Sequence, residues 1–138
     1  MKRARILLAD DHKGVGEALQ SLLSSEFDLV GLVEDGLRLI EAATALNPDV
    51  IVADLSMPRL DGLGAMARLR EKNPAIKFIL MTMHQDATLA QVALENGASG
   101  FVVKYLASDE LFPAIHAVLE GDTYVSPVLG SKSAITGL

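Results

Sequence analysis

The chain has 138 residues, half of them hydrophobic, and a formal net charge of −6. A chain of this length forms one ordinary domain with a sizeable buried core. Because the sequence has no cysteine, disulfides, zinc–thiolate sites and thiol chemistry are excluded. An acidic chain without a basic stripe is also a poor candidate for direct nucleic-acid binding, whereas a cluster of carboxylates suits a hard cation.

The hydropathy of the sequence gives no sign of a targeting or membrane segment. The apolar stretch near the N-terminus is too short for the core of a signal peptide. No apolar run approaches the length that a membrane-spanning helix needs. We therefore expect a cytoplasmic protein with no membrane partner.

Five short apolar runs divide the sequence at intervals of roughly 22 to 26 residues, and each gap has a helical pattern. The third, fourth and fifth runs are apolar throughout, which is typical of parallel strands covered by helices on both faces. In chain order the runs are "RILLA", "DLVGLV", "DVIVA", "KFILM" and "GFVVK". The pattern predicts a parallel sheet of five strands with helices between them.

The segments between the runs also carry signals for helix ends. Gly97 stands where a glycine commonly follows the last turn of a helix, after the fourth helical segment. Ser108 is predicted to cap the fifth helix, with Asp109 and Glu110 in its first turn. From Thr123 the periodic pattern dissolves, so residues 123–138 are predicted to be a linker or tail.

Polar residues follow four of the predicted strands. Asp10 and Asp11 come after the first strand, Asp54 after the third, Thr82 after the fourth and Lys104 at the end of the fifth. Because parallel strands present their carboxyl ends at one edge of the sheet, we expect these residues to meet there. Two adjacent aspartates repel each other, and a divalent cation would offset that repulsion.

These side chains suit phosphoryl transfer. Mg²⁺ binds one or two carboxylates and completes its coordination with waters and phosphate oxygens. A carboxylate beside the metal can attack a phosphoryl group, and an ammonium and a hydroxyl can stabilise the transferred oxygens. The sequence therefore predicts an acyl-phosphate site that uses Mg²⁺ as its cofactor.

The motifs "ILLADDH", "VIVADLSMPRLDG", "ILMT" and "NGASGFVVK" resemble the receiver domain of two-component response regulators. With "ADDH" near the start and "GDTYVSP" near the end, the chain looks most like the NarL/FixJ subfamily, whose receivers precede a LuxR-type helix-turn-helix domain. The resemblance implies a three-layer αβα, flavodoxin-like (βα)5 fold with strand order 2-1-3-4-5. It implies a receiver domain over residues 1–122 and, beyond it, a linker or tail with the output domain absent from this chain.

The same resemblance implies a role for each site residue. Asp54 is the phosphoacceptor, and Lys104 contacts the phosphoryl group. The implied Mg²⁺ ligands are Asp10, Asp11, Asp54 and the backbone carbonyl of Ser56. Thr82 and Phe101 occupy the two switch positions, and Thr82 also belongs to the reacting site.

The implied partners are a sensor histidine kinase and the protein's own output domain, a helix-turn-helix in this subfamily. The whole protein is then a transcription regulator. A homodimer formed on phosphorylation is one possible state, and the sequence leaves the oligomeric state open. The chain would not be an enzyme, because it supports only its own Mg²⁺-dependent phosphorylation and dephosphorylation. It departs from many receivers at Phe101, where they have tyrosine, and at Tyr105, where they have a cis proline.

Other interpretations of these residues stay open. Asp10 and Asp11 could cap a helix, and Asp54 could belong to a turn. His12 is interpreted as a loop residue and not as a Mg²⁺ ligand, because imidazole suits softer metals. The whole chain could also be a phosphohydrolase of the haloacid-dehalogenase kind, although its nucleophile follows the third strand. A third alternative is an interaction module that works without phosphorylation.

Overall fold

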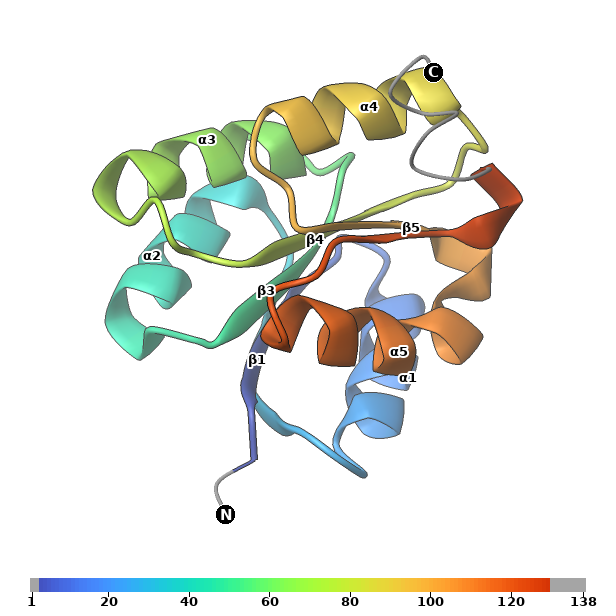
Figure 1. Cartoon of the computed structure of the whole chain (residues 1–138). Coiled ribbons are helices and arrows are strands. Elements are labelled where there is room, and N and C mark those ends of the chain that lie inside the picture. Colours follow the sequence, from blue (N-terminus) through green and yellow to red (C-terminus); the bar gives the residue numbers. More distant parts are fainter. Residues whose placement is uncertain (1–2, 130–138) are drawn as a thin grey trace.

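The computed structural model describes residues 3–129, which form one parallel sheet between two layers of helices (Figure 1). The strands are β1 (Arg5–Ala9), β2 (Asp28–Val33), β3 (Val50–Asp54), β4 (Phe78–Thr82), β5 (Gly100–Val103) and β6 (Tyr124–Val125). The helices are α1 (Lys13–Leu23), α2 (Gly36–Leu46), α3 (Gly62–Lys72), α4 (Ala87–Glu95) and α5 (Ala107–Leu119). Two 3₁₀ turns, η1 (Lys104–Leu106) and η2 (Pro127–Leu129), follow β5 and β6.

The sheet has six strands in the order β2-β1-β3-β4-β5-β6. The predicted order 2-1-3-4-5 is confirmed, but the prediction of five strands is wrong. The sixth strand pairs Tyr124 with Gly100 and Val125 with Phe101. A strand of two residues is too short to show any hydrophobic period, so the sequence pattern missed it. It lies in the segment predicted to be linker or tail, of which residues 130–138 are outside the described part.

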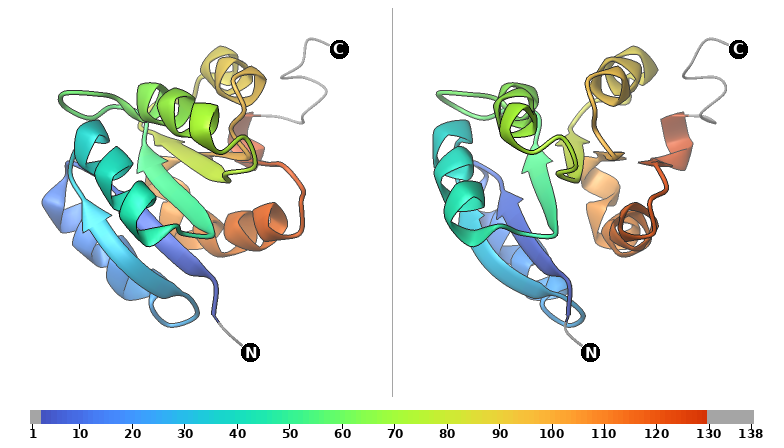
Figure 2. Two further views of the ribbon diagram at one scale, coloured as in Figure 1. Left: turned by 90° about the vertical axis from the view of Figure 1, so that its left-hand side faces the viewer. Right: turned by 60° about the vertical axis from the view of Figure 1, so that its left-hand side comes forward.

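The helices cover both faces of the sheet. α1 and α5 pack on one face, and α2, α3 and α4 pack on the other (Figure 2). Alternate residues of a strand enter opposite layers, so Leu8 joins the layer of α1 and α5 while Leu7 joins the other. Every residue of β3 and β4 is buried, which explains why these runs are apolar throughout.

The helix ends follow ordinary capping chemistry. Asp35, Asp61 and Asp86 each accept a hydrogen bond from a backbone N–H in the first turn of α2, α3 and α4. Gly97 follows α4 with a φ of 105°, which confirms its predicted place. α5 begins at Ala107 and not after Ser108, because the η1 turn leads straight into it. Among residues 3–129, no helix is long and apolar enough to span a membrane.

The loop between β3 and α3 returns closely against the end of β3. The N–H of Gly62 donates to the carbonyl of Leu55 at 2.9 Å. A Cβ added at Gly62 would lie 2.5 Å from the backbone oxygen of Asp54, closer than van der Waals contact allows. Glycine at this position therefore lets α3 start directly beside Asp54.

We expect Gly62→Ala to lower the free energy of unfolding by about 1–3 kcal/mol, the usual cost of overpacking. The methyl group would push the start of α3 away from the backbone of Asp54. Gly14→Ala is the matched control, because a Cβ there meets nothing within 4 Å and alanine favours the helix. Urea denaturation of both variants measures the effect, and equal stability of Gly62→Ala and wild type would contradict it.

Candidate functional site

Polar side chains from four strand ends lie together at one edge of the sheet. Asp10 follows β1, Asp54 ends β3, Thr82 ends β4 and Lys104 follows β5. Each of the four residues is 5% exposed or less. Polar groups are rarely buried to this extent unless they are paired or bind a ligand. The parallel topology brings the predicted site residues together as the sequence analysis expects.

The Lys104 ammonium lies between two buried carboxylates. Its Nζ is 2.9 Å from Asp10 Oδ1 and 2.5 Å from Asp54 Oδ2. Burial acts to lower the pKa of Lys104, but its hydrogen bonds to Asp54 and Asp10 and their negative charges outweigh burial, so the pKa is raised. The ammonium therefore stays charged beside both acids over the physiological pH range.

Backbone amides hold the two buried carboxylates in place. The N–H of His12 donates to Asp10 Oδ1 at 2.8 Å, and the N–H of Ser56 donates to Asp54 Oδ1 at 3.2 Å. Within the described chain, Asp10 Oδ2 is buried and has no hydrogen-bond partner. A buried anionic oxygen without a partner is costly, and a bound cation is one way to satisfy it.

The oxygen ligands available around Asp10 fit a hard divalent cation. Asp10, Asp11 and Asp54 each offer a carboxylate oxygen and His12 offers a ring nitrogen, and these atoms lie within 4.8 Å of one another. Carboxylates and a backbone carbonyl are the ligands that Mg²⁺ prefers. Asp11 is the more exposed acid, with a third of its side chain accessible, so it lies toward solvent at the mouth of the site.

His12, interpreted from the sequence as a loop residue, lies at the mouth of this pocket. Its Nδ1 is 2.8 Å from Lys104 Nζ and within 3.3–3.6 Å of an oxygen of Asp10, Asp11 and Asp54. The side chain is 57% exposed. The sequence signal for this position is that His12 directly follows Asp10 and Asp11. The expectation that it does not bind Mg²⁺ stays a prediction.

A cavity of about 190 Å³ opens beside Asp54. It is lined by His12, Asp54, Leu55, Ser56, Thr82, Met83, His84 and Leu89. Thr82 Oγ1 accepts a hydrogen bond from the N–H of His84 at 3.1 Å, which leaves its proton free to reach an acceptor in the cavity. The cavity therefore has room and a donor for a small anionic group next to the Asp54 carboxylate.

Phe101 lies deeper, on the same face of the sheet as Thr82. Leu80 pairs with Phe101 and Thr82 pairs with Val103, so Thr82 and Phe101 are diagonal neighbours across β4 and β5. Phe101 is fully buried in the layer of α2, α3 and α4. Tyr105 is 57% exposed, and residues 3–129 contain no cis peptide bond, so Lys104 and Tyr105 are joined in trans.

A second polar cluster links α5 to the C-terminal segment. Glu110 Oε1 accepts hydrogen bonds from Ser126 Oγ at 2.6 Å and from the Tyr124 hydroxyl at 3.2 Å. Burial, the charge of Glu110 and this hydrogen bond raise the pKa of Tyr124 to about 12. The folded protein therefore holds the Tyr124 proton more tightly than the unfolded chain does.

Because the pKa of Tyr124 is raised, we expect this cluster to contribute to the free energy of unfolding. The contribution is complete below pH 10 and is lost as the pH rises to about 12. Tyrosinate absorbance of a Tyr105→Phe variant reports Tyr124 alone, since the chain has two tyrosines. Its midpoint should lie near 12 and should fall in Glu110→Gln, with circular dichroism confirming that the fold persists. An unchanged midpoint in Glu110→Gln would contradict the assignment.

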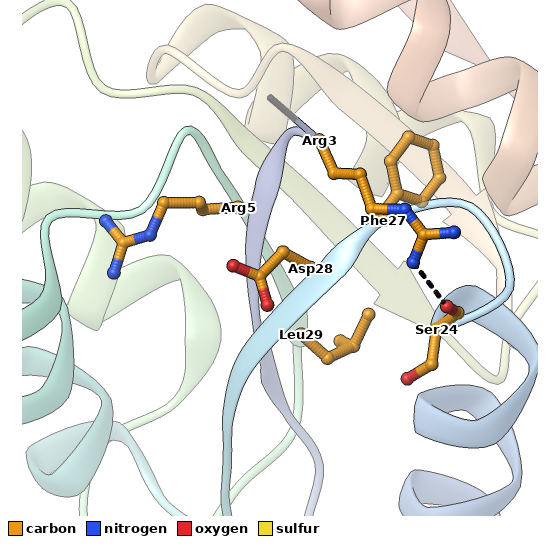
Figure 3. Close-up of a pocket in the computed structure, with 6 residues that line it drawn as sticks. All are labelled: Arg3, Arg5, Ser24, Phe27, Asp28 and Leu29. Atoms are coloured by element: carbon orange, nitrogen blue, oxygen red, sulfur yellow. Dashed lines mark hydrogen bonds between the residues drawn. The ribbon is translucent and has the colours of Figure 1, made fainter. Parts of the chain in front are cut away.

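Two larger cavities lie away from the carboxylates. One, of about 580 Å³, lies at the amino-terminal ends of β1 and β2 and is lined in part by Arg3 and Arg5 (Figure 3). Arg3 donates to the carbonyls of Ser24 and Ser25 after α1, and Arg5 donates to those at the end of α2. These guanidinium groups cap helix C-termini, where carbonyls lack partners. The other cavity, of about 690 Å³, lies between α2 and α3.

Comparison with known proteins agrees with this geometry. The sequence matches the response regulator receiver domain family over residues 6–116. It is 32% identical over 127 residues to the transcriptional regulatory protein DegU of Brevibacillus brevis, covering 91% of this chain and 54% of DegU. It is 33% identical over 128 residues to the nitrate/nitrite response regulator protein NarL of Escherichia coli K12, covering 91% of this chain and 59% of NarL. This chain therefore spans little more than half the length of these relatives.

The fold gives the same result. A crystal structure of a two-component response regulator of the LuxR family from Aurantimonas sp. SI85-9A1 superposes with a TM-score of 0.90 at 33% identity, covering 96% of both chains. The family match extends over most of the chain and includes β1, β3, β4 and β5 with the side chains at their ends. This chain belongs to the receiver domain family of response regulators, and its relatives are of the NarL and LuxR type.

Proposed function

We propose that this chain is a phosphorylation-operated switch that accepts a phosphoryl group on Asp54 from a sensor histidine kinase. One observation carries the proposal. The Lys104 ammonium contacts Asp54 in a buried pocket that also contains an unpartnered oxygen of Asp10. Such a pocket pairs a nucleophilic carboxylate with one fixed cation and with oxygen ligands for a second.

In the proposed reaction a carboxylate oxygen of Asp54 attacks phosphorus. The new oxygen–phosphorus bond forms as the bond between phosphorus and the donor's imidazole nitrogen breaks, and the imidazole keeps the electron pair. Lys104 moves from the attacking carboxylate to a phosphoryl oxygen, and the Thr82 hydroxyl donates a hydrogen bond to another. Positioning and charge stabilisation of this kind supply most of the catalysis in phosphoryl transfer.

Asp10, Asp11, Asp54 and the carbonyl of Ser56 would hold Mg²⁺. The ion, when bound, neutralises charge on the phosphoryl oxygens. The unpartnered Asp10 Oδ2 supports this assignment, because the two carboxylates and one ammonium leave one negative charge in the buried pocket. Asp11 would add the solvent-facing ligand.

The surface around the pocket supports a protein as the phosphoryl donor. Val15, Met83 and Tyr105 are 43%, 58% and 57% exposed, and together with His12 and Lys104 they line a largely apolar cavity of about 250 Å³. Exposed apolar side chains beside a reactive group are typical of a protein-binding site. A histidine kinase would cover them while its phosphohistidine reaches Asp54.

The readout is proposed to run through Thr82 and Phe101 to the face of α4, β5 and α5. The full-length protein would carry a helix-turn-helix output domain and regulate transcription in the cytoplasm. The name of the relative DegU, a transcriptional regulatory protein, supports the role in transcription. A homodimer formed on phosphorylation stays a prediction. The chain acts only on itself and turns over no separate substrate.

The proposal is tested by incubating the chain with acetyl phosphate and Mg²⁺ and measuring its intact mass. We expect a gain of one phosphoryl group in wild type, no gain in Asp54→Ala, and a full gain in Asp109→Ala, which removes an exposed carboxylate of α5. No gain in wild type, or an equal gain in Asp54→Ala, would refute the proposal.

Two further measurements separate the alternatives. Mg²⁺ should raise the melting temperature of wild type more than that of Asp10→Asn, because a ligand of the folded state stabilises it. If Mg²⁺ has no effect, the interaction module without phosphorylation is favoured. Turnover of phosphate monoesters would instead favour the phosphohydrolase, whose nucleophile follows the first strand and not, like Asp54, the third.

A further inference from the structure

Residues Tyr124–Leu129, called the strap below, run along the outer edge of β5 (Figure 1, red). The N–H of Ser126 donates to the carbonyl of Phe101 at 3.0 Å. Leu129 is buried in the core layer of α4, whereas Tyr124 packs into the layer of α5. The strap therefore closes the sheet across both helical layers, beside the switch position.

The hydroxyl of Ser126 replaces a backbone carbonyl in the sheet. If the parallel pairing continued, the N–H of Val103 would donate to the carbonyl of Ser126. That carbonyl instead accepts from the N–H of Leu129 at 2.9 Å and starts η2. Ser126 Oγ accepts from Val103 in its place, at 2.8 Å. Ser126 is fully buried, so the last amide of β5 depends on this hydroxyl.

Glu110 fixes the direction of that hydroxyl. Ser126 Oγ donates its proton to Glu110 Oε1 at 2.6 Å, and the Tyr124 hydroxyl donates to the same oxygen at 3.2 Å. A serine hydroxyl has one proton, so donation to Glu110 leaves a lone pair for the N–H of Val103. The carboxylate thus orients the serine as an acceptor.

Val103 is the residue directly before Lys104, and the η1 turn begins at Lys104. The hydrogen bond at Val103 therefore fixes the peptide from which the Lys104 side chain extends between Asp10 and Asp54. We propose that Ser126, oriented by Glu110, is a positioning residue for Lys104 and thereby couples the strap to the phosphoacceptor pocket. The proposal rests on the proposed function of Asp54 and adds to it a contact from outside the pocket.

The coupling has to work in both directions. If a docked strap favours the productive position of Lys104, then a phosphoryl group held by Lys104 must change the docking of the strap by the same factor. The strap precedes residues 130–138. A change in its docking would therefore act on the chain segment that follows.

The first experiment compares phosphorylation rates with acetyl phosphate and Mg²⁺ at saturating and limiting donor. Ser126→Ala and Glu110→Ala should lower the maximal rate about three- to tenfold, the factor that corresponds to one net hydrogen bond. The donor concentration for half-maximal rate should stay unchanged, since Lys104 acts on the transferred group. Glu110→Gln keeps an acceptor oxygen and should restore the rate. Ser21→Ala, an exposed serine of α1, is the matched control.

The second experiment measures backbone hydrogen exchange by NMR with and without beryllium fluoride and Mg²⁺, a stand-in for the phosphoryl group. In wild type, the exchange rate of the Ser126 and Val103 amides should change at least threefold on addition. In Ser126→Ala this response should be lost, while amides in β1 and β3 keep their protection.

The outcomes separate the two proposals. Wild-type rates in folded Ser126→Ala and Glu110→Ala would overturn the positioning role and leave the phosphoacceptor role of Asp54 intact. Unchanged exchange rates of the Ser126 and Val103 amides on addition of beryllium fluoride would overturn the coupling and likewise leave the role of Asp54 intact. If wild type itself gains no phosphoryl group, the proposed function fails and the positioning role fails with it.

Discussion

Replacing Lys104 with methionine is expected to lower the free energy of unfolding by about 3–5 kcal/mol near neutral pH. Methionine keeps much of the side-chain volume but removes the ammonium that contacts Asp10 and Asp54. The two carboxylates, from residues 1% and 2% exposed, then face each other without that countercharge. Urea denaturation without Mg²⁺ measures the loss, because two-state transitions report the difference directly.

Lys13→Met is the matched control, since Lys13 is exposed at the start of α1 and its loss should change stability little. Addition of Mg²⁺ should restore part of the stability of Lys104→Met, because the ion replaces the missing positive charge. The phosphorylation rate should remain about 10²–10³-fold reduced, the usual effect of losing one charge-stabilising donor. A stability within about 1 kcal/mol of wild type without Mg²⁺ would contradict the electrostatic argument.

The stability difference between wild type and Lys104→Met should also depend on pH in a defined direction. The pKa of Lys104 is raised in the folded state, so its contribution to stability is complete below its ordinary pKa of 10.5. That contribution declines as the pH rises past this value toward the folded-state pKa. The stability difference between wild type and Lys104→Met should therefore be constant at neutral pH and shrink in alkaline solution.

Replacing Phe101 with alanine is expected to cost about 3–5 kcal/mol, the range for an aromatic side chain removed from a packed core. Phe101 is fully buried in the core layer that also contains side chains of α4, β4 and the strap. Its ring has no hydroxyl to satisfy, so the expected loss comes from apolar burial and from the cavity that remains. Thermal or urea denaturation measures the change.

Phe112→Ala is the control for the chemical change, because Phe112 is only partly buried and stacks on Phe27. Its cost should be clearly smaller. If Phe101→Ala were as stable as Phe112→Ala, the Phe101 ring would not be packed as the structure has it. A rotation of Phe101 on phosphorylation would then not require neighbouring side chains to move apart.

Most of the fold could be predicted from the sequence because the informative residues are numerous and repetitive. Strands β3, β4 and β5 are buried on both faces, so their runs are apolar throughout and easily recognised. Parallel topology alone then brings Asp10, Asp54 and Lys104 to one edge. This part of the site follows from chain order and strand direction, without knowledge of any side-chain contact.

The remaining features depend on contacts that carry no periodic signal. β6 has two residues, and the hydroxyl of Ser126 stands in the sheet where a backbone carbonyl is expected. His12 meets Lys104 across 92 positions, and its role at the mouth depends on side-chain geometry. The start of α5 differs from the prediction because η1 continues directly into the helix. Turns of this kind leave little hydrophobic pattern in the sequence.

The hydrogen bond between Lys104 and Asp10 joins residues 94 positions apart, so it cannot form until the chain has been synthesised through β5. A nascent chain that ends before β5 lacks the ammonium, and an unfolded chain has no edge at which the acids and the amine can meet. If Asp54 accepts the phosphoryl group as proposed, its phosphorylation requires a chain that has folded through β5. Shorter nascent chains and misfolded copies would then not compete with the folded protein for phosphoryl groups.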